Sequence, residues 1–306
     1  MVSLDRFELF CAVVQTGSFT GAAARLEQTR AAVSFSIKQL EAELGVTLLT
    51  RTTRRIALTD AGERFYGHCL EVVHAAQVAI DEARAEHSGL QGSLRITSTV
   101  EYGLRVLAPA LHGFCQQHPQ LQVQLQTHTA QADLVRDGFD VAIRLGQVQD
   151  SSYRGVCLDS YALCLVMAPA LLAPGQDVLD NLERVGQLPQ LRHSRFQQHD
   201  SWPVEDARGH PGQYQGRGPA AMVADNASIL RAFAVQGMGV ALLPLWLVDA
   251  DLASGALIDA LPGYRFARQS VYALYPDTRH VPRKVRAWID YLKAYLQDPV
   301  RARPGA

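Results

Sequence analysis

The stretch that most constrains the fold is residues 17–55, which reads as a short helix, a tight turn, a longer helix and a basic hairpin. Ser18 is a typical helix-start residue, because its hydroxyl can accept hydrogen bonds from the first free backbone amides. Thr29 is placed to begin the second helix in the same way. Apolar residues then recur at helical spacing and form one stripe: Val33, Ile37, Leu40 and Leu44. A helix-turn-helix is therefore predicted at residues 19–38.

The opposite face of the second helix carries the residues that we predict to read DNA. At about 100° per residue, the positions that face away from the stripe are Arg30, Ala31, Ser34, Phe35 and Lys38. Two cations, a hydroxyl and an outward aromatic ring suit a major groove, which offers phosphates, base edges and thymine methyl groups together. The pattern predicts a winged helix-turn-helix that also contacts DNA through Ser18 and Thr29.

The hairpin after this helix is predicted to hold the DNA backbone. The net charge is −1, so DNA binding must depend on where the positive charge is placed. Cations and hydroxyls concentrate at the hairpin turn: Arg51, Thr52, Thr53, Arg54 and Arg55. A solvated turn is the alternative explanation. Directly after a helix-turn-helix we favour phosphate contacts, which fix the register of the protein on DNA and carry little sequence information.

The bulk features describe an ordinary soluble chain. Its 306 residues are enough for about two domains. The first ten residues include Asp5 and lack the apolar core of a signal peptide, and the longest apolar run, 240–248, is too short to cross a bilayer. We therefore expect no membrane association and a cytoplasmic protein that joins the nucleoid when it binds DNA. The five cysteines lack metal-ligand spacing and are expected to be reduced: Cys11, Cys69, Cys115, Cys157 and Cys164.

One long helix is predicted from residue 60 to about residue 87. Asp60 with Glu63 fits a capping box, and Thr59 is an alternative cap. Apolar and small residues then recur at heptad spacing: Phe65, Cys69, Val72, Ala76, Ala79 and Ala83. The helix could pack on its own domain, but that domain looks too small to cover it. We favour a dimerisation helix, so that two copies present two recognition helices to a roughly palindromic operator.

Beyond a glycine-containing hinge at 88–92, the chain alternates between strand and helix patterns. Strands are predicted at 93–98, 122–127, 139–144, 162–168 and 271–275, and helices at 102–118, 130–137, 226–236 and 282–296. Repeated strand–helix–strand units predict a parallel sheet with helices on both faces.

These residues resemble the LysR-type transcriptional regulators. The family pattern A-x-x-x-G-S-F-T-x-A-A-x-x-L is found at 12–26 with one additional spacing residue, and A-V-S-x-x-I-x-x-L-E-x-x-L-G-V-x-L-L-x-R is found at 32–51. The ending L-T-x-A-G follows at 58–62. Many members have Ser-Gln-Pro at the positions of residues 29–31 and a Lys or Arg at the position of Phe35. These departures fall on the predicted reading face, so they concern the operator sequence and leave the fold unchanged.

The resemblance implies an effector domain similar to periplasmic binding proteins, with two α/β lobes joined by two crossing segments. Its matching segments are 92–96, 138–144 and 237–244. The expected division is a DNA-binding domain at 1–59, a linker helix at 60–88, lobe I at 92–160 plus 268–297, and lobe II at 161–267. The resemblance also implies a homodimer, a homotetramer built from two dimers, and contact with RNA polymerase if the protein activates transcription.

An effector site is expected where the carboxyl ends of strands meet helix N-termini. The residues that this rule selects are Ser98, Thr99, Val100, Thr127, His128, Thr129, Arg144, Asn226 and Ala227. Hydroxyls, a helix start and an arginine favour a small anion such as a carboxylate. Each residue alone has a structural explanation as a cap, and it is the set that indicates a site. No cofactor is expected besides this small-molecule co-inducer.

Three other functions are compatible with parts of the sequence. A redox-sensing regulator could use Cys157 and Cys164, and the second part alone is typical of a small-molecule binding protein without a DNA role. An α/β sheet is compatible with many enzymes. No nucleophile elbow, phosphate loop or paired carboxylates supports an enzyme, and the stretch with His193, His199, Asp200 and His210 matches no recognised metal site. We therefore predict a non-enzymatic, sequence-specific DNA-binding regulator of the LysR type, without a metal, that responds to a small molecule.

Overall fold

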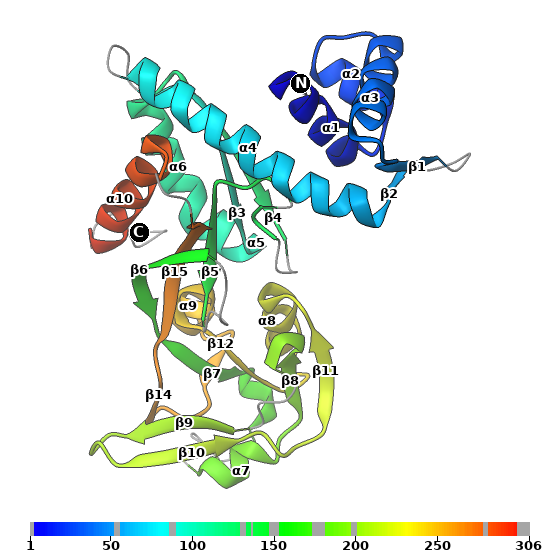
Figure 1. Cartoon of the computed structure of the whole chain (residues 1–306). Coiled ribbons are helices and arrows are strands. Elements are labelled where there is room, and N and C mark those ends of the chain that lie inside the picture. Colours follow the sequence, from blue (N-terminus) through cyan, green and yellow to red (C-terminus); the bar gives the residue numbers. More distant parts are fainter. Residues whose placement is uncertain are drawn as a thin grey trace.

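The computed structural model describes residues 3–51, 56–85, 90–128, 133–135, 137–146, 153–172, 181–196, 201–277 and 281–298. Within these ranges the chain forms an N-terminal helical domain, one long helix and two α/β lobes (Figure 1). This is the predicted multidomain architecture. Among the described residues, no helix has both the length and the apolar character that a bilayer crossing requires.

The N-terminal domain packs three helices against a small hairpin. Its elements are α1 (Leu4–Thr16), α2 (Phe19–Arg25), α3 (Arg30–Leu44), β1 (Leu49–Arg51) and β2 (Ile56–Leu58). The Ser18 hydroxyl accepts hydrogen bonds from the first amides of α2, and the Thr29 hydroxyl accepts one at the start of α3. The apolar stripe of α3 points into the core, because Val33, Ile37 and Leu40 are completely buried. Local sequence patterns therefore determine this domain.

The long helix α4 (Asp60–Ala85) connects this domain to the lobes. The hydroxyl of Thr59, the alternative cap, accepts a hydrogen bond from the Gly62 amide at 2.9 Å. The N-terminal half of α4 packs on α1, where the Phe65 ring lies 5.4 Å from Phe7 and Cys69 is buried. Further along, Val72 is 43% exposed. The heptad stripe is thus divided between a first part that completes the DNA-binding domain and a second part that is open.

Lobe I is built on a five-stranded sheet in the order β4-β3-β5-β15-β6. The strands are β3 (Gly92–Ser98), β4 (Leu121–Thr127), β5 (Val141–Leu145), β6 (Tyr153–Tyr161) and β15 (Gln269–Pro276). Helices α6 (Ala108–Gln117) and α10 (Arg283–Gln297) meet over its core, where Phe114 and Trp288 are fully buried with ring centroids 5.1 Å apart. The predicted helix at 102–118 is α5 (Val100–Tyr102), a π-helical turn (Gly103–Leu107) and α6 in succession.

Lobe II contains a second five-stranded sheet in the order β11-β8-β12-β7-β13 and a three-stranded sheet in the order β10-β9-β14. The strands are β7 (Leu163–Met167), β8 (Gln190–His193), β9 (Ser201–Asp206), β10 (Pro211–Gln215), β11 (Ala220–Ala224), β12 (Val240–Pro244), β13 (Ile258–Asp259) and β14 (Tyr264–Phe266). The helices are α7 (Leu182–Gly186), α8 (Ala227–Val235) and α9 (Leu245–Ser254), with 3₁₀ turns at Pro169–Leu171 and Ser194–Phe196.

The expectation of a parallel sheet holds for part of each lobe, where β3 is parallel to β4 and β5 and β8 is parallel to β11 and β12, but both sheets are mixed. In lobe I, β15 is antiparallel to both of its neighbours, and in lobe II β7 is antiparallel to β12 and β13. These are the strands that follow the two crossings between the lobes, so each enters its new sheet from the opposite end. The helix predicted at 130–137 is also not supported, because its described residues, 133–135 and 137, lie in turns or irregular backbone and the others lie outside the described residues.

Candidate functional site

The predicted reading face of α3 is open. Phe35 is 61% exposed, an unusual position for a large apolar ring. Arg30, Ala31 and Lys38 are exposed beside it, and Ser34 is half-buried. An exposed phenylalanine lacks about 1.5–3 kcal/mol of stabilisation that burial would provide. The ring at this position is therefore explained by a contact with a partner and not by the stability of the domain. Together these residues form a surface with both charge and an apolar centre.

One carboxylate holds the wing, which is the β1–β2 hairpin, against the recognition helix α3. Glu41 on α3 accepts hydrogen bonds from the backbone amides of Leu48 at 2.8 Å and Leu49 at 3.1 Å. Gly62 permits a close approach from the other side, because a Cβ there would lie 2.1 Å from the Leu48 carbonyl oxygen. Helix, wing and α4 therefore form one unit. The predicted contacts Thr52, Thr53, Arg54 and Arg55, and the side chain of Arg51, lie outside the described residues.

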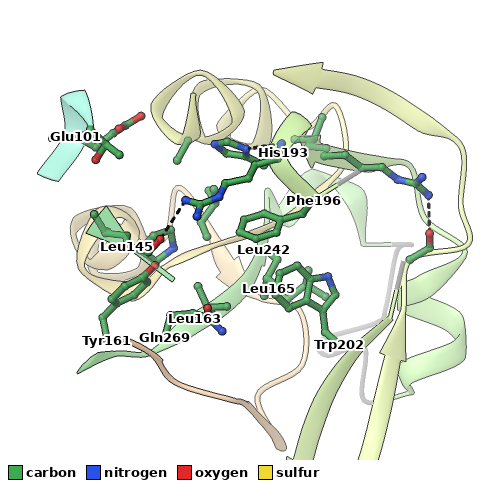
Figure 2. A pocket seen from close by; sticks show the side chains of 18 of the residues that line it. Glu101, Leu145, Tyr161, Leu163, Leu165, His193, Phe196, Trp202, Leu242 and Gln269 are labelled. Atoms are coloured by element: carbon green, nitrogen blue, oxygen red, sulfur yellow. Dashed lines mark hydrogen bonds between the residues drawn. The ribbon is translucent and has the colours of Figure 1, made fainter. Parts of the chain in front are cut away.

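A cavity of about 170 Å³ lies where the two lobes meet (Figure 2). Lobe I and its crossing segments contribute Thr99, Glu101, Leu145, Tyr161 and Gln269. Lobe II contributes Leu163, Leu165, Gln190, Leu191, Arg192, His193, Arg195, Phe196, Trp202, Tyr214, Gly216, Asp225, Ala227, Leu242, Leu243, Pro244 and Trp246. The lining is dominated by leucine and aromatic side chains, with few charged groups.

Hydrogen bonds join the lobes around this cavity. Arg195 of lobe II donates to the Leu145 carbonyl oxygen of lobe I at 3.1 Å. In the other direction, the carboxylate of Glu101 in lobe I accepts a hydrogen bond from the Ser228 amide at the start of α8, at 3.3 Å. The cavity is therefore bounded by groups whose contacts depend on how closely the lobes approach.

Burial sets the charge of the polar groups in the lining. It lowers the pKa of His193 below its ordinary value, which keeps this imidazole neutral at pH 7. It raises the pKa of Tyr161 and of Tyr214 to about 12, so both hydroxyls stay protonated. Arg192 donates to the Gly216 carbonyl oxygen at 2.6 Å, and Arg195 is held as described above. These hydrogen bonds fix the two guanidinium groups in place and leave their positive charge unchanged, because a backbone carbonyl carries no net charge.

Two of the predicted effector residues, Thr99 and Ala227, line this cavity. Ser98 is completely buried, because it shares the face of β3 that carries Leu94 and Ile96 into the core of lobe I. Its hydroxyl has no hydrogen-bond partner among the described residues. Thr99 follows the last residue of β3 and precedes α5, and it lines the cavity while Ser98 faces the core, so the two do not share one site.

The other predicted effector residues lie elsewhere. Arg144 is 7% exposed, and its Nη2 has no partner within the described part of the chain. Thr127 is close to Gly103, where a Cβ would meet its methyl group at 2.8 Å, and it is absent from the cavity lining together with the exposed Val100 and His128. Asn226 caps α8 by accepting from the Ile229 amide. Thr129 lies outside the described residues.

Sequence reasoning missed Glu101 and the aromatic lining. Glu101 lies in α5, three residues after the last residue of β3, and this position close to the end of a strand was the available signal. Tyr161, Phe196 and Trp246 come from separate segments and read in the sequence as ordinary core residues. Only the folded arrangement brings them together.

The redox and metal alternatives gain no support from the described residues. Cys157 is exposed on β6, whereas Cys164 is buried in lobe II, where burial raises the pKa of its thiol and so disfavours the reactive thiolate. His193 lines the cavity and His210 pairs with Asp206 at 3.0 Å, while His199 and Asp200 lie outside the described residues. Within the described ranges, no three His, Cys, Asp or Glu side chains gather as a metal site would require.

Two domain families match the chain. The family described as "Bacterial regulatory helix-turn-helix protein, lysR family" matches residues 4–63, and "LysR substrate binding domain" matches residues 87–297. The HTH-type transcriptional regulator PtxR of Pseudomonas aeruginosa is 32% identical over 302 residues, which cover 98% of this chain and 95% of the relative. The chain is thus similar to this relative along nearly its entire length.

Solved structures are similar over the same span. CrgA, a LysR-type transcriptional regulator from Neisseria meningitidis, is 30% identical with a TM-score of 0.58, covering 97% of this chain and 100% of CrgA. The Vibrio cholerae virulence activator AphB is 26% identical with a TM-score of 0.59, covering 96% of this chain and 99% of AphB. The likeness includes the N-terminal domain, the linker helix and both lobes.

Proposed function

Because this chain belongs to the LysR family of transcriptional regulators, we propose that its N-terminal domain binds DNA and that its two lobes bind a small-molecule effector. The chain is a sequence-specific DNA-binding regulator with an effector-binding domain. The observation that carries the proposal is the exposed face of α3. A solvent-facing phenylalanine flanked by Arg30 and Lys38 is explained by a partner that is both anionic and partly apolar, as a major groove is.

The proposed DNA contacts follow from this face. Ser34, Phe35 and Lys38 lie toward the base edges, while Arg30 and the wing residues Arg51, Arg54 and Arg55 contact phosphates on either side. Ser18 and Thr29, whose hydroxyls cap their helices, and the remaining positions Ala31, Thr52 and Thr53 complete the interface. The link from Glu41 to the wing supports this division, because it couples the position of the phosphate contacts to the helix that reads bases.

We propose that two copies associate through the open part of α4. Val72 and Ile80 are 43% and 41% exposed on this helix, and Ala79 is exposed between them. Small and apolar side chains at helical spacing allow two such helices to approach closely. A homodimer then carries two recognition helices, and a homotetramer of two dimers extends the contact along the promoter.

We propose the interlobe cavity as the effector site. An effector that binds one lobe closure more tightly shifts the population toward it, and the shift is transmitted to the arrangement of subunits on DNA. The bonds from Arg195 to Leu145 and from Ser228 to Glu101 support this, because both span the lobes. We place the protein in the cytoplasm on the nucleoid, with RNA polymerase as a further partner if it acts as an activator.

The test uses purified protein and a labelled promoter fragment from beside its own gene. We expect a dimer or tetramer in solution and a footprint of two half-sites on one face of the duplex. Arg54→Ala weakens specific and non-specific DNA binding alike and lowers the slope of log K against log salt by about 1. Arg286→Ala, an exposed arginine on α10, is the matched control and leaves the slope unchanged. A monomeric protein that does not bind the promoter fragment contradicts the proposal.

A further inference from the structure

The size of the interlobe cavity limits its occupant. Its volume of about 170 Å³ is close to that of an engineered cavity of about 150 Å³ in another protein, which accepts benzene. A single ring with one short substituent therefore fills the cavity, and a fused polycyclic molecule would extend beyond it.

The walls of the cavity suit an aromatic ring. Figure 2 shows the Phe196 ring between His193 and Trp202. The Phe196 and Trp202 centroids are 5.2 Å apart in an edge-to-face arrangement, and those of Phe196 and His193 are 5.7 Å apart. Tyr161 and Trp246 make a second edge-to-face pair at 6.2 Å. Ring faces and edges at these angles stabilise a further ring inserted among them.

The charges around the cavity disfavour an anion. The N-terminus of α8 is the natural place for a ligand carboxylate. Here the protein's own carboxylate, that of Glu101, accepts from the Ser228 amide at that terminus, and Glu101 is only 7% exposed. Asp225 adds a second negative group to the lining, while Arg195 donates to a backbone carbonyl oxygen. The carboxylates of Glu101 and Asp225 balance the guanidinium groups of Arg192 and Arg195, so the lining offers an entering carboxylate no excess positive charge, and Glu101 repels it at the helix terminus.

The remaining polar groups define what the ligand must offer. Tyr161 lines the cavity and keeps its hydroxyl proton, so this hydroxyl can donate a hydrogen bond to a ligand oxygen. The carboxylate of Glu101 is an acceptor and is satisfied by a ligand N–H or O–H. A substituent with both a donor and an acceptor meets both needs.

We propose that the effector is an uncharged, single-ring aromatic molecule whose substituent both donates and accepts hydrogen bonds, and that Glu101 excludes aromatic carboxylates. This rests on the proposed effector role of the cavity, and it replaces the small anion expected from the sequence. Glu101 thus serves as a specificity-determining residue: it occupies the anion-binding helix terminus and repels any ligand that would compete for it.

The test compares benzamide with benzoate, which have nearly the same shape and differ in charge. Binding to the full-length protein at pH 7.5 is measured by quenching of tryptophan fluorescence and by saturation-transfer NMR. We expect benzamide to bind at least about tenfold more tightly, because like charges in a partly buried site repel strongly. Glu101→Gln lowers the ratio of benzamide affinity to benzoate affinity, because benzoate binds more tightly. Glu183 is an exposed carboxylate on α7, and Glu183→Gln leaves this ratio unchanged.

Phe196→Leu provides a second variant, which weakens both probes and shows that they occupy this cavity. Melting temperatures establish that each variant is folded. Equal or tighter binding of benzoate to the unaltered protein overturns the proposal, as does an absence of benzamide binding or binding that Phe196→Leu does not affect. The same samples are assayed on the promoter fragment. Normal DNA binding together with tighter binding of benzoate refutes only this inference. A preference for benzamide without DNA binding supports this inference and contradicts the proposed DNA contacts.

Discussion

Replacing Glu41 tests whether the wing and the recognition helix move as one unit. Glu41→Ala removes the acceptor for the amides of Leu48 and Leu49, and these residues are 1% and 5% exposed. Each hydrogen bond to a charged group contributes about 1.5–3 kcal/mol, and an unsatisfied buried amide costs a similar amount. Allowing for water that enters after the substitution, we expect local opening of α3 and the wing to become easier by about 3 kcal/mol.

The assay is amide hydrogen exchange of the full-length protein, followed in peptides that cover residues 30–51. A loss of about 3 kcal/mol corresponds to roughly a hundredfold faster exchange in these peptides, with little change in the lobes. Glu41→Gln keeps a neutral hydrogen-bond acceptor in place, so it should recover about half of the free energy of local opening that Glu41→Ala loses. Operator affinity should fall in the same order, because displaced wing residues lose their phosphate contacts.

The matched control is Glu43→Ala on the same helix. The Glu43 carboxylate pairs with Arg6 at the protein surface, where exposed ion pairs contribute little. Its removal should leave the exchange of the same peptides nearly unchanged. An acceleration of less than tenfold for Glu41→Ala, or equal effects for Glu41→Ala and Glu43→Ala, would refute the idea that this carboxylate fixes the wing.

Four further predictions follow from particular contacts. Phe35→Ala should alter base preference in a randomised operator library more than it alters overall affinity, because the exposed ring meets base edges and not phosphates. Gly239→Ala should destabilise lobe II by at least about 1–3 kcal/mol in urea denaturation, since its Cβ would lie 2.4 Å from a backbone carbonyl oxygen, whereas Gly263→Ala meets no atom within 4 Å and should be neutral. Acidification below pH about 6.5 should destabilise the fold in thermal melts, because burial lowers the folded-state pKa of His193 and the unfolded chain then binds a proton that the folded chain does not; His193→Gln should reduce this loss. Val72→Glu should shift the oligomer toward monomer in analytical ultracentrifugation, because a charge would replace an exposed apolar side chain at the proposed contact.

The parts of the fold that depend on neighbouring residues could be predicted well. The stripe of α3 and the caps at Ser18 and Thr29 are local, so spacing and residue type were sufficient. The linker helix lies where the sequence predicts it. Phe65 and Cys69 of its stripe pack into the core of the N-terminal domain, and a dimer contact through the remaining turns stays a prediction. Spacing shows which residues share a helix face and does not show which partner covers each turn.

The direction of strands and the cavity lining depend on contacts between distant segments. The sequence pattern of a strand is the same for either direction of the strand in its sheet. The antiparallel orientation of β7 and β15 could therefore be predicted only with knowledge of where the chain crosses between the lobes. The effector site was predicted from polar residues at strand ends, yet Ser98 faces the core and Thr99 the cavity. The aromatic residues of the lining had no polar signature and could be recognised only once the lobes were in place.

The two crossings have a mechanical consequence. They lie side by side, because Tyr161 at the end of β6 pairs with Gln269 at the start of β15, and both residues also line the cavity. Two connections that lie side by side resist twisting of one lobe against the other and leave one rotation, about an axis that runs through both. A molecule held against Tyr161 and Gln269 lies near this axis, so a small change of angle there moves the far rim of lobe II by a large distance.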